Sequence, residues 1–199
     1  MPKVIDRERR RQEIAEAVCR AVAKRGIEAT TVREIAEEAG FSTGVLAHYF
    51  EDKDALILHA LHVSIERAVK RMEQRSHDMT GLEALRAVLH EALPLDEKRR
   101  EEWRVWIGFW GRAVNNAALT VKQNHRYALW QDVVRTLIEE SQRDGAIRAE
   151  LNAEREARAL VAFVDGIGIR ATFEPDRLSP EEQISLLDRH LAWLTTGRA

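Results

Sequence analysis

The sequence predicts an all-α protein of about nine helices. Apolar side chains recur with helical spacing along nearly the whole chain of 199 residues, and no segment shows the alternation of a strand. Only four prolines and ten glycines interrupt this pattern. Because 45% of the residues are hydrophobic, the chain can bury a sizeable core, and its length fits two domains.

Helices are expected near residues 6–25, 31–39, 42–49, 53–77, 81–93, 96–116, 118–144, 153–173 and 180–196. Gly40 and Gly145 follow expected helix ends, where glycine can close the last turn. Pro94 cannot continue the helix before it, since it has no backbone N–H to donate. Ser179 and Pro180 together mark the start of the last helix.

Residues 31–49 have the pattern of two short helices joined by a tight turn. Thr31 can cap the first helix, and Glu34 completes a capping box. Ser42 can cap the second. A turn of about three residues forces the two helices to cross steeply, as in a helix-turn-helix. Such patterns also occur in proteins that do not bind DNA, so the short motif alone leaves both interpretations open.

The second short helix separates into two faces. Leu46 and Phe50, four residues apart, are expected to face the protein. The other side offers short residues that let the backbone approach the major groove, a donor for base edges, and groups that can reach phosphates. These residues are Thr43, Gly44 and Val45, then His48, and finally Tyr49 and Lys53.

The string from Ala39 to Lys53 resembles TetR-family transcriptional repressors, and it is most similar to their choline-responsive BetI-like branch. The match extends from Ile14 to Leu56. In the family, the matching positions contact DNA: Thr31, Arg33, Thr43, Gly44, Val45, His48, Tyr49 and Lys53. Many members carry Tyr where this chain has Ala47, so any contact through that ring is not carried over.

The resemblance implies a ligand-responsive regulator that binds a palindromic operator as a homodimer and is released by a small-molecule effector. We expect a DNA-binding domain over residues 1–52 and an effector-binding and dimerisation domain over residues 53–199. An activator without effector-released repression, or a helical small-molecule-binding protein that keeps the motif as a scaffold, is the alternative. A strong loss of DNA affinity with salt would argue against the scaffold.

The N-terminal residues are basic although the whole chain has a net charge of −2. Residues 1–25 hold eight Lys and Arg against four Asp and Glu, a local balance of +4. The Arg9-Arg10-Arg11 run can lie along DNA phosphates as a sequence-independent anchor. It can equally be a solvated helix face.

Aromatic residues gather in the second half of the chain. Trp103, Trp106 and Trp110 recur on one helix face, and the next helix adds Tyr127 and Trp130. These rings could line a pocket for a flat apolar molecule or hold a quaternary ammonium group by cation–π contacts. The resemblance favours the cation, while plain core packing explains the rings equally well. The expected effector site is Trp103, Trp106, Trp110, Asn115, Tyr127, Trp130 and Asp165.

Two glycines interrupt the helix expected at residues 153–173. Each costs about 1 kcal/mol in a helix interior, and close helix approach would compensate for that cost. In the family, the last two helices of each subunit form the dimer interface. The resemblance therefore places dimer contacts at Gly166, Gly168, Ile184, Leu187, Leu191 and Leu194. Packing within one subunit explains the apolar face of the last helix nearly as well.

Catalytic motifs and cofactor-binding motifs are missing from the sequence, so we expect neither an enzyme nor a cofactor. His59, His62 and Glu66 share a helix face with a spacing that a metal could use. A polar helix face is the better explanation, so no metal site is predicted.

Since no apolar stretch approaches the roughly 20 residues of a membrane helix and the start lacks a signal-like segment, we expect a cytoplasmic protein with no membrane partner.

Overall fold

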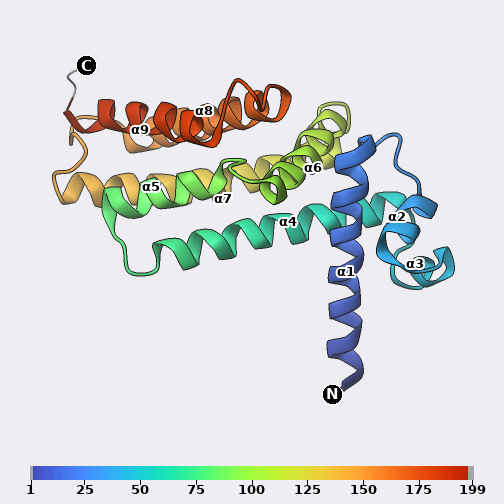
Figure 1. Cartoon of the computed structure of the whole chain (residues 1–199). Helices are drawn as coiled ribbons and strands as arrows, with labels where there is room; N and C mark the ends of the chain where they lie inside the picture. Colours follow the sequence, from blue (N-terminus) through green and yellow to red (C-terminus); the bar gives the residue numbers. More distant parts are fainter. Residues whose placement is uncertain (1, 197–199) are drawn as a thin grey trace. The chain divides into compact units, whose positions relative to one another are not determined.

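The computed structural model describes residues 2–196, with side chains for residues 7–195 (Figure 1). Within that range the elements are α1 (Pro2–Arg25), α2 (Val32–Ala39), α3 (Thr43–Tyr49), α4 (Lys53–Ser76), α5 (Gly81–Ala92), α6 (Glu97–Ala113), α7 (Ala117–Arg143), α8 (Ala153–Phe173) and α9 (Pro180–Thr196). No strand occurs among these residues, so the predicted all-α class is confirmed. None of these helices is both long and apolar enough to cross a bilayer.

Two helix ends differ from the prediction for identifiable reasons. The first helix, α1, begins at Pro2 rather than near residue 6, because proline is well suited to the first position of a helix. Helix α6 ends at Ala113 rather than near residue 116. There the Asn116 side chain accepts a hydrogen bond from the Leu119 backbone N–H at 3.2 Å, so Asn116 caps α7 instead of extending α6.

The chain forms two compact units. The N-terminal unit runs to Arg67 and includes Arg100–Arg112, while the C-terminal unit comprises Ala68–Arg99 and the residues from Ala113 onward. The sequence suggested a simple boundary between residues 52 and 53. By packing, the N-terminal unit also takes in the first part of α4 and most of α6.

Two side-chain contacts show why α6 packs with the N-terminal unit. The indole Nε1–H of Trp106 donates to Ser64 Oγ of α4 at 2.8 Å. The Arg112 guanidinium pairs with the Asp54 carboxylate at the start of α4, also at 2.8 Å. Both contacts join residues that are far apart in the sequence, so helical periodicity alone could not indicate them.

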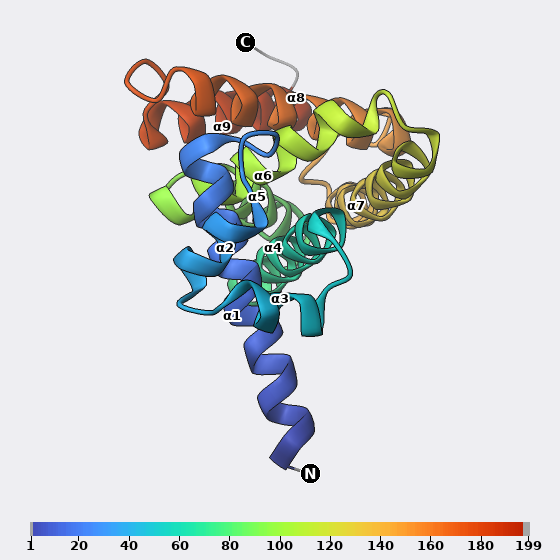
Figure 2. The same cartoon turned by 90° about the vertical axis from the view of Figure 1, so that its right-hand side faces the viewer.

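The short helices α2 and α3 follow α1 within the N-terminal unit (Figure 2). Thr31 and Glu34 form the predicted capping box at the start of α2. Gly40 closes α2 in the left-handed conformation, with φ of 70°. Ser42 then caps α3 by accepting from the Val45 N–H at 3.3 Å. Buried apolar residues of this unit include Ile14, Val18, Val22, Ile35, Leu46, Phe50, Leu56, Ile57, Leu61, Trp103 and Phe109.

In the C-terminal unit, α7 packs against α5 and α8, and α9 packs against α5 and α8. Figure 1 shows α8 and α9 side by side. The buried core of this unit includes Leu85, Leu89, Leu93, Val134, Ile138, Leu160, Val161, Val164, Ile167, Leu187, Leu191 and Leu194. Gly81 begins α5 with φ of +53°, and a Cβ added there would lie 3.0 Å from Asp144 Oδ2. The start of α5 therefore requires glycine.

We expect Gly81→Ala to lower the free energy of unfolding by about 1–2 kcal/mol, since the left-handed backbone disfavours any Cβ. Urea denaturation monitored by circular dichroism measures the change. The control is Gly111→Ala in α6, where an added Cβ meets no atom within 4 Å. This control should raise the stability by roughly 0.5–1 kcal/mol through helix propensity. Equal effects of the two variants would contradict the explanation.

Candidate functional site

The predicted DNA-contacting residues are all accessible to solvent. We call residues 31–53, which span α2, α3 and the start of α4, the reading head. The exposed members of the set are Thr31, Arg33, Thr43, Gly44 and His48, and the partly exposed members are Val45, Tyr49 and Lys53. None of these side chains is needed to fill the core, so the whole set can meet a partner.

Helix α3 is anchored on one side and open on the other, as its sequence predicted. The side chains of Leu46 and Phe50 are only 1% and 7% exposed, respectively. On the other side, an added Cβ at Gly44 would meet nothing closer than Ser42 Oγ at 3.8 Å. The N-terminal turn of α3 therefore presents bare backbone, which can approach a groove of duplex DNA closely.

The two cations predicted at the edge of the reading head make weak surface contacts. Arg33 Nε lies 3.1 Å from Glu37 Oε1, and both side chains are exposed. Lys53 Nζ donates to the backbone carbonyl of Glu28 at 3.1 Å. Because exposed pairs of this kind contribute little to stability, both cations can exchange these contacts for phosphates.

Thr31 uses its polar groups within the protein. Its backbone N–H and its hydroxyl both donate to Glu34 Oε2, at 2.8 and 3.0 Å. The pKa of Glu34 is therefore lowered, chiefly by these hydrogen bonds from Thr31. A phosphate contact by the Thr31 hydroxyl would have to replace its bond to Glu34.

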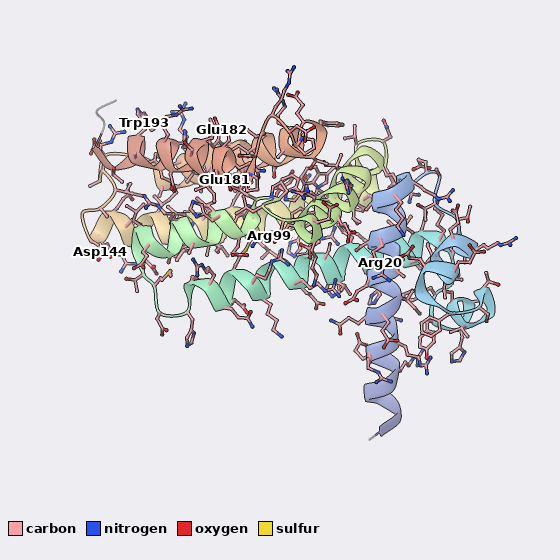
Figure 3. All side chains as sticks on the ribbon, viewed as in Figure 1. Arg20, Arg99, Asp144, Glu181, Glu182 and Trp193 are labelled. Carbon is pink, nitrogen blue, oxygen red and sulfur yellow. The ribbon has the colours of Figure 1, made fainter. Side chains whose placement is uncertain are left out.

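Part of the basic N-terminal charge holds α1 against α2. Arg20 of α1, labelled in Figure 3, donates from Nε to Glu38 Oε1 at 2.8 Å. Lys24 Nζ donates to the other carboxylate oxygen at 2.6 Å. Hydrogen bonds from Lys24 and Arg20, in that order, lower the pKa of Glu38. These two cations serve packing, so the positive charge left for phosphates is smaller than the local sum suggests.

The tryptophan triplet lies in the N-terminal unit. Trp103 is 2% exposed, and its ring centroid lies 5.3 Å from that of Trp106 and 5.8 Å from that of Trp110. Trp106 and Trp110 remain partly accessible. Trp103 is thus a core residue by burial, which agrees with the packing explanation for this member of the set. Asn115, predicted as an orienting residue, is exposed just before α7.

Tyr127 and Asp165 form a polar pair between α7 and α8. The Tyr127 hydroxyl donates to Asp165 Oδ2 at 2.9 Å. Burial raises the pKa of Asp165 to about 6, and the hydrogen bond from Tyr127 partly opposes this shift. Burial, followed by the Asp165 charge, raises the pKa of Tyr127. An incompletely solvated carboxylate beside an aromatic ring is a suitable partner for an organic cation.

This pair borders an open pocket of about 390 Å³ within the C-terminal unit. Sequence reasoning missed three of its polar lining residues, which are Asn124, Gln131 and Arg158. The sequence could have indicated two of them. Asn124 and Gln131 lie one helical turn before and after Tyr127, so they share its helix face. Trp130, also predicted, packs partly buried against the core of the same unit.

The predicted dimerisation residues divide into two groups. Leu187, Leu191 and Leu194 are fully buried in the core of their own subunit, and Gly168 is also buried. Packing within one subunit accounts for these four. Gly166 is exposed, with nothing within 4 Å of an added Cβ, and Ile184 is partly exposed.

The outward surfaces of α8 and α9 also expose large apolar side chains. Phe173 at the end of α8 is 70% exposed, and Trp193 near the end of α9, labelled in Figure 3, is 44% exposed. Aromatic residues are enriched at protein–protein interfaces, so these two rings can contribute to one.

The histidines of α4 do not assemble into a metal centre. His62 Nε2 pairs with Glu66 Oε1 at 3.2 Å on an exposed face. His59 instead lies against Phe50, with ring centroids 5.2 Å apart. Over the described residues, no group of three or more His, Cys, Asp or Glu side chains could hold a metal ion.

Comparison with known proteins adds two family matches. Residues 14–60 match the tetR family of bacterial regulatory proteins, and residues 81–196 match the family of BetI-type transcriptional repressors, C-terminal. The HTH-type transcriptional regulator PksA of Bacillus subtilis (strain 168) is 31% identical, covering 96% of this chain and 92% of its own. The HTH-type transcriptional regulator BetI of Pseudomonas aeruginosa (strain LESB58) is 26% identical, covering 96% and 98%.

Solved structures agree with these matches. A transcriptional regulator from Rhodococcus sp. Rha1 is 28% identical, with a TM-score of 0.81 over 94% of this chain and 96% of the other. A putative transcriptional regulator from Saccharomonospora viridis, described as in complex with choline, is 26% identical, with a TM-score of 0.84 over 92% and 95%. These relatives are regulators of transcription and not enzymes. The tetR-family match over residues 14–60 confirms the resemblance carried by residues 39–53.

Proposed function

Because the chain belongs to the TetR family of transcriptional regulators and has a BetI-type C-terminal domain, we propose that it is a homodimeric repressor released from a palindromic operator by a small organic cation. The observation that carries the proposal is the two-sided helix α3. Leu46 and Phe50 anchor it, while the backbone at Gly44 is open to solvent. A helix held in this way can enter a major groove without disturbing the core.

In the proposed complex, base reading and backbone binding fall to different residues. Thr43, Gly44 and Val45 bring the start of α3 against the base edges, and His48 supplies a donor. Arg33 and Lys53 exchange their weak surface contacts for phosphates. Two subunits related by a two-fold axis would place their recognition helices about 34 Å apart, or a multiple of it, which predicts a palindromic operator.

The proposed dimer uses the outward surfaces of α8 and α9. Gly166 leaves open space above the α8 backbone, where a helix of a second copy can approach closely. Phe173 and Trp193 offer exposed apolar area for the same contact. The leucines of α9 support this surface from inside the subunit.

The proposed effector is an organic cation bound at the Tyr127–Asp165 pair. The carboxylate supplies the countercharge and the phenol ring supplies a cation–π surface. A relative from Saccharomonospora viridis described in complex with choline supports this class of ligand. Trp130 and Asn115 stay predicted contacts of this site, while Trp106 and Trp110 stay predictions from the sequence alone.

Release from DNA requires that the effector prefer one conformer of the subunit. The ligand can weaken operator binding only by the difference between its affinities for the DNA-bound and released conformers. Coupling of this kind is typically worth about 1–3 kcal/mol.

Operator binding is tested with a duplex selected by genomic footprinting of the purified protein. We expect the affinity to fall steeply with salt, because phosphate contacts release counterions.

His48→Ala should weaken binding by about 1–3 kcal/mol and relax the preference at one base pair. His77→Ala serves as the matched control, since His77 is an exposed histidine of the C-terminal unit that pairs with Asp78. Fluorescence anisotropy measures the salt dependence and the affinities of the variants. A DNA affinity that does not change with salt would exclude the repressor.

Effector binding is tested by calorimetry with choline as the probe. Since the ionised form of Asp165 attracts the cation and its pKa is raised to about 6, choline affinity should fall as the pH drops through about 6. Asp165→Asn should bind choline more weakly and without this pH dependence. The control Asp132→Asn removes an exposed carboxylate of α7 that pairs with Arg135. An unchanged choline affinity in Asp165→Asn would contradict the site.

Dimerisation is tested by placing a charge on the outward surface of α8. Gly166→Arg introduces a long cation into space that the subunit leaves open, so the subunit should fold normally. Burying this charge in the interface should convert the dimer to a monomer in sedimentation experiments. Val133→Arg, on an exposed part of α7, is the control and should remain dimeric. A Gly166→Arg variant that stays dimeric would exclude this surface.

A further inference from the structure

Three arginines of α1 lie over aromatic rings of the reading head. Measured from the guanidinium carbon to the ring centre, the distances are 6.0 Å for Arg7 and Tyr49, 5.4 Å for Arg10 and Phe41, and 4.8 Å for Arg11 and Phe50. Arg11 makes the shortest of these contacts, and Phe50 is one of the two anchors of α3. Arg11 therefore lies against the carboxyl-terminal end of α3, the proposed recognition helix.

Arg11 also reaches the carboxyl end of α3. Its Nη1 donates to the carbonyl oxygen of Tyr49, the last residue of α3, at 3.3 Å. The final carbonyls of a helix have no partner within the helix and carry the negative end of its dipole. A cation at this position satisfies one of them and opposes the dipole. The second nitrogen, Nη2, lies 3.5 Å from His59 Nδ1.

His59 completes the arrangement as a neutral acceptor. Since a guanidinium only donates, this contact is a hydrogen bond when His59 Nδ1 accepts, as it can in the neutral ring. Burial first, and then the Arg11 charge, lower the pKa of His59. The Glu8 carboxylate and a hydrogen bond to the Arg11 backbone oppose this shift, and the His62 charge adds slightly to it. The ring also lies against Phe50. Protonation would remove the acceptor and place a second positive charge beside Arg11.

We propose that Arg11, held by neutral His59, is a positioning residue that fixes the carboxyl end of α3 in its DNA-reading orientation and does not itself contact phosphates. The inference rests on the operator binding proposed above. A helix as short as α3 has little stability of its own, so its orientation depends on such contacts. Without Arg11, only a fraction of molecules would present α3 correctly, and the dissociation constant would rise by the inverse of that fraction.

Salt-dependent DNA binding separates this role from a phosphate contact. Arg11→Ala should weaken operator binding by about tenfold, the effect of one lost charge-assisted hydrogen bond, with an unchanged salt slope. A lost phosphate contact would instead reduce the slope by about one. Arg11→Lys should not restore affinity, because an ammonium cannot both stack flat on Phe50 and donate in two directions. Arg143→Ala removes the same charge from an exposed site paired with Glu140 and calibrates the effect of charge loss alone.

Hydrogen exchange of the free protein tests the same role without DNA. Amides of residues 43–50 should exchange faster in Arg11→Ala and Arg11→Lys than in the wild type, while amides of α7 and α8 should not change. Because this measurement needs no operator, it remains decisive if the proposed DNA binding fails. Unchanged exchange in α3 would overturn the inference.

The pH dependence of binding gives a readout that simple loss of packing would not alter. Acidification from neutral pH to well below the usual His pKa of 6.5 should weaken operator binding through His59, whose pKa is lowered from that value. His59→Gln keeps an acceptor for Arg11 but does not titrate, so it should bind normally at neutral pH and lose the acid-dependent weakening. The inference is overturned if His59→Gln keeps the full acid effect. The inference is also overturned if Arg11→Ala binds the operator like the wild type. It is likewise overturned if Arg11→Ala lowers the salt slope by one unit and Arg11→Lys restores both slope and affinity.

Discussion

The burial of Leu46 and Phe50 is the constraint on which the DNA-binding surface depends. A seven-residue helix does not persist alone in water, because the cost of nucleation exceeds the gain from so few hydrogen bonds. The Ser42 cap lowers that cost, and packing of the two apolar side chains supplies the remaining stability. Since both anchors lie on one side of α3, the residues on its other side remain accessible to solvent.

The charge distribution follows from the same arrangement. A chain with a net charge of −2 cannot bind a polyanion through its overall field, so local cations must do so. Arg20 and Lys24 are held by Glu38, and Arg11 lies on Phe50. These three cations are used within the protein, so Arg33 and Lys53 of the reading head remain to contact phosphates. This favours a regulator whose affinity depends on the fit of α3 in the groove as well as on charge.

Local features of the fold were predictable from the sequence, whereas contacts between distant residues were not. The capping box at Thr31, the left-handed Gly40 and the two faces of α3 each depend on residues within one or two turns. The membership of α6 in the N-terminal unit depends on pairs such as Trp106 with Ser64, which no periodicity encodes. An apolar face also does not reveal what covers it. Leu187 and Leu191 suit a dimer contact and an internal core equally well, and burial assigns them to the core.

Regulation requires a physical link between the proposed effector pair and the reading head. The chain crosses between its two compact units inside α4 and inside α6, and not in a loop. Burial leaves the ionised form of Asp165 poorly solvated and so raises its pKa. A bound cation would offset the free-energy cost of the poorly solvated carboxylate. The size of this effect would differ between conformers that bury the carboxylate to different extents. An ionisable group held in an unfavourable environment can therefore give a small cation the conformer preference that release from DNA demands.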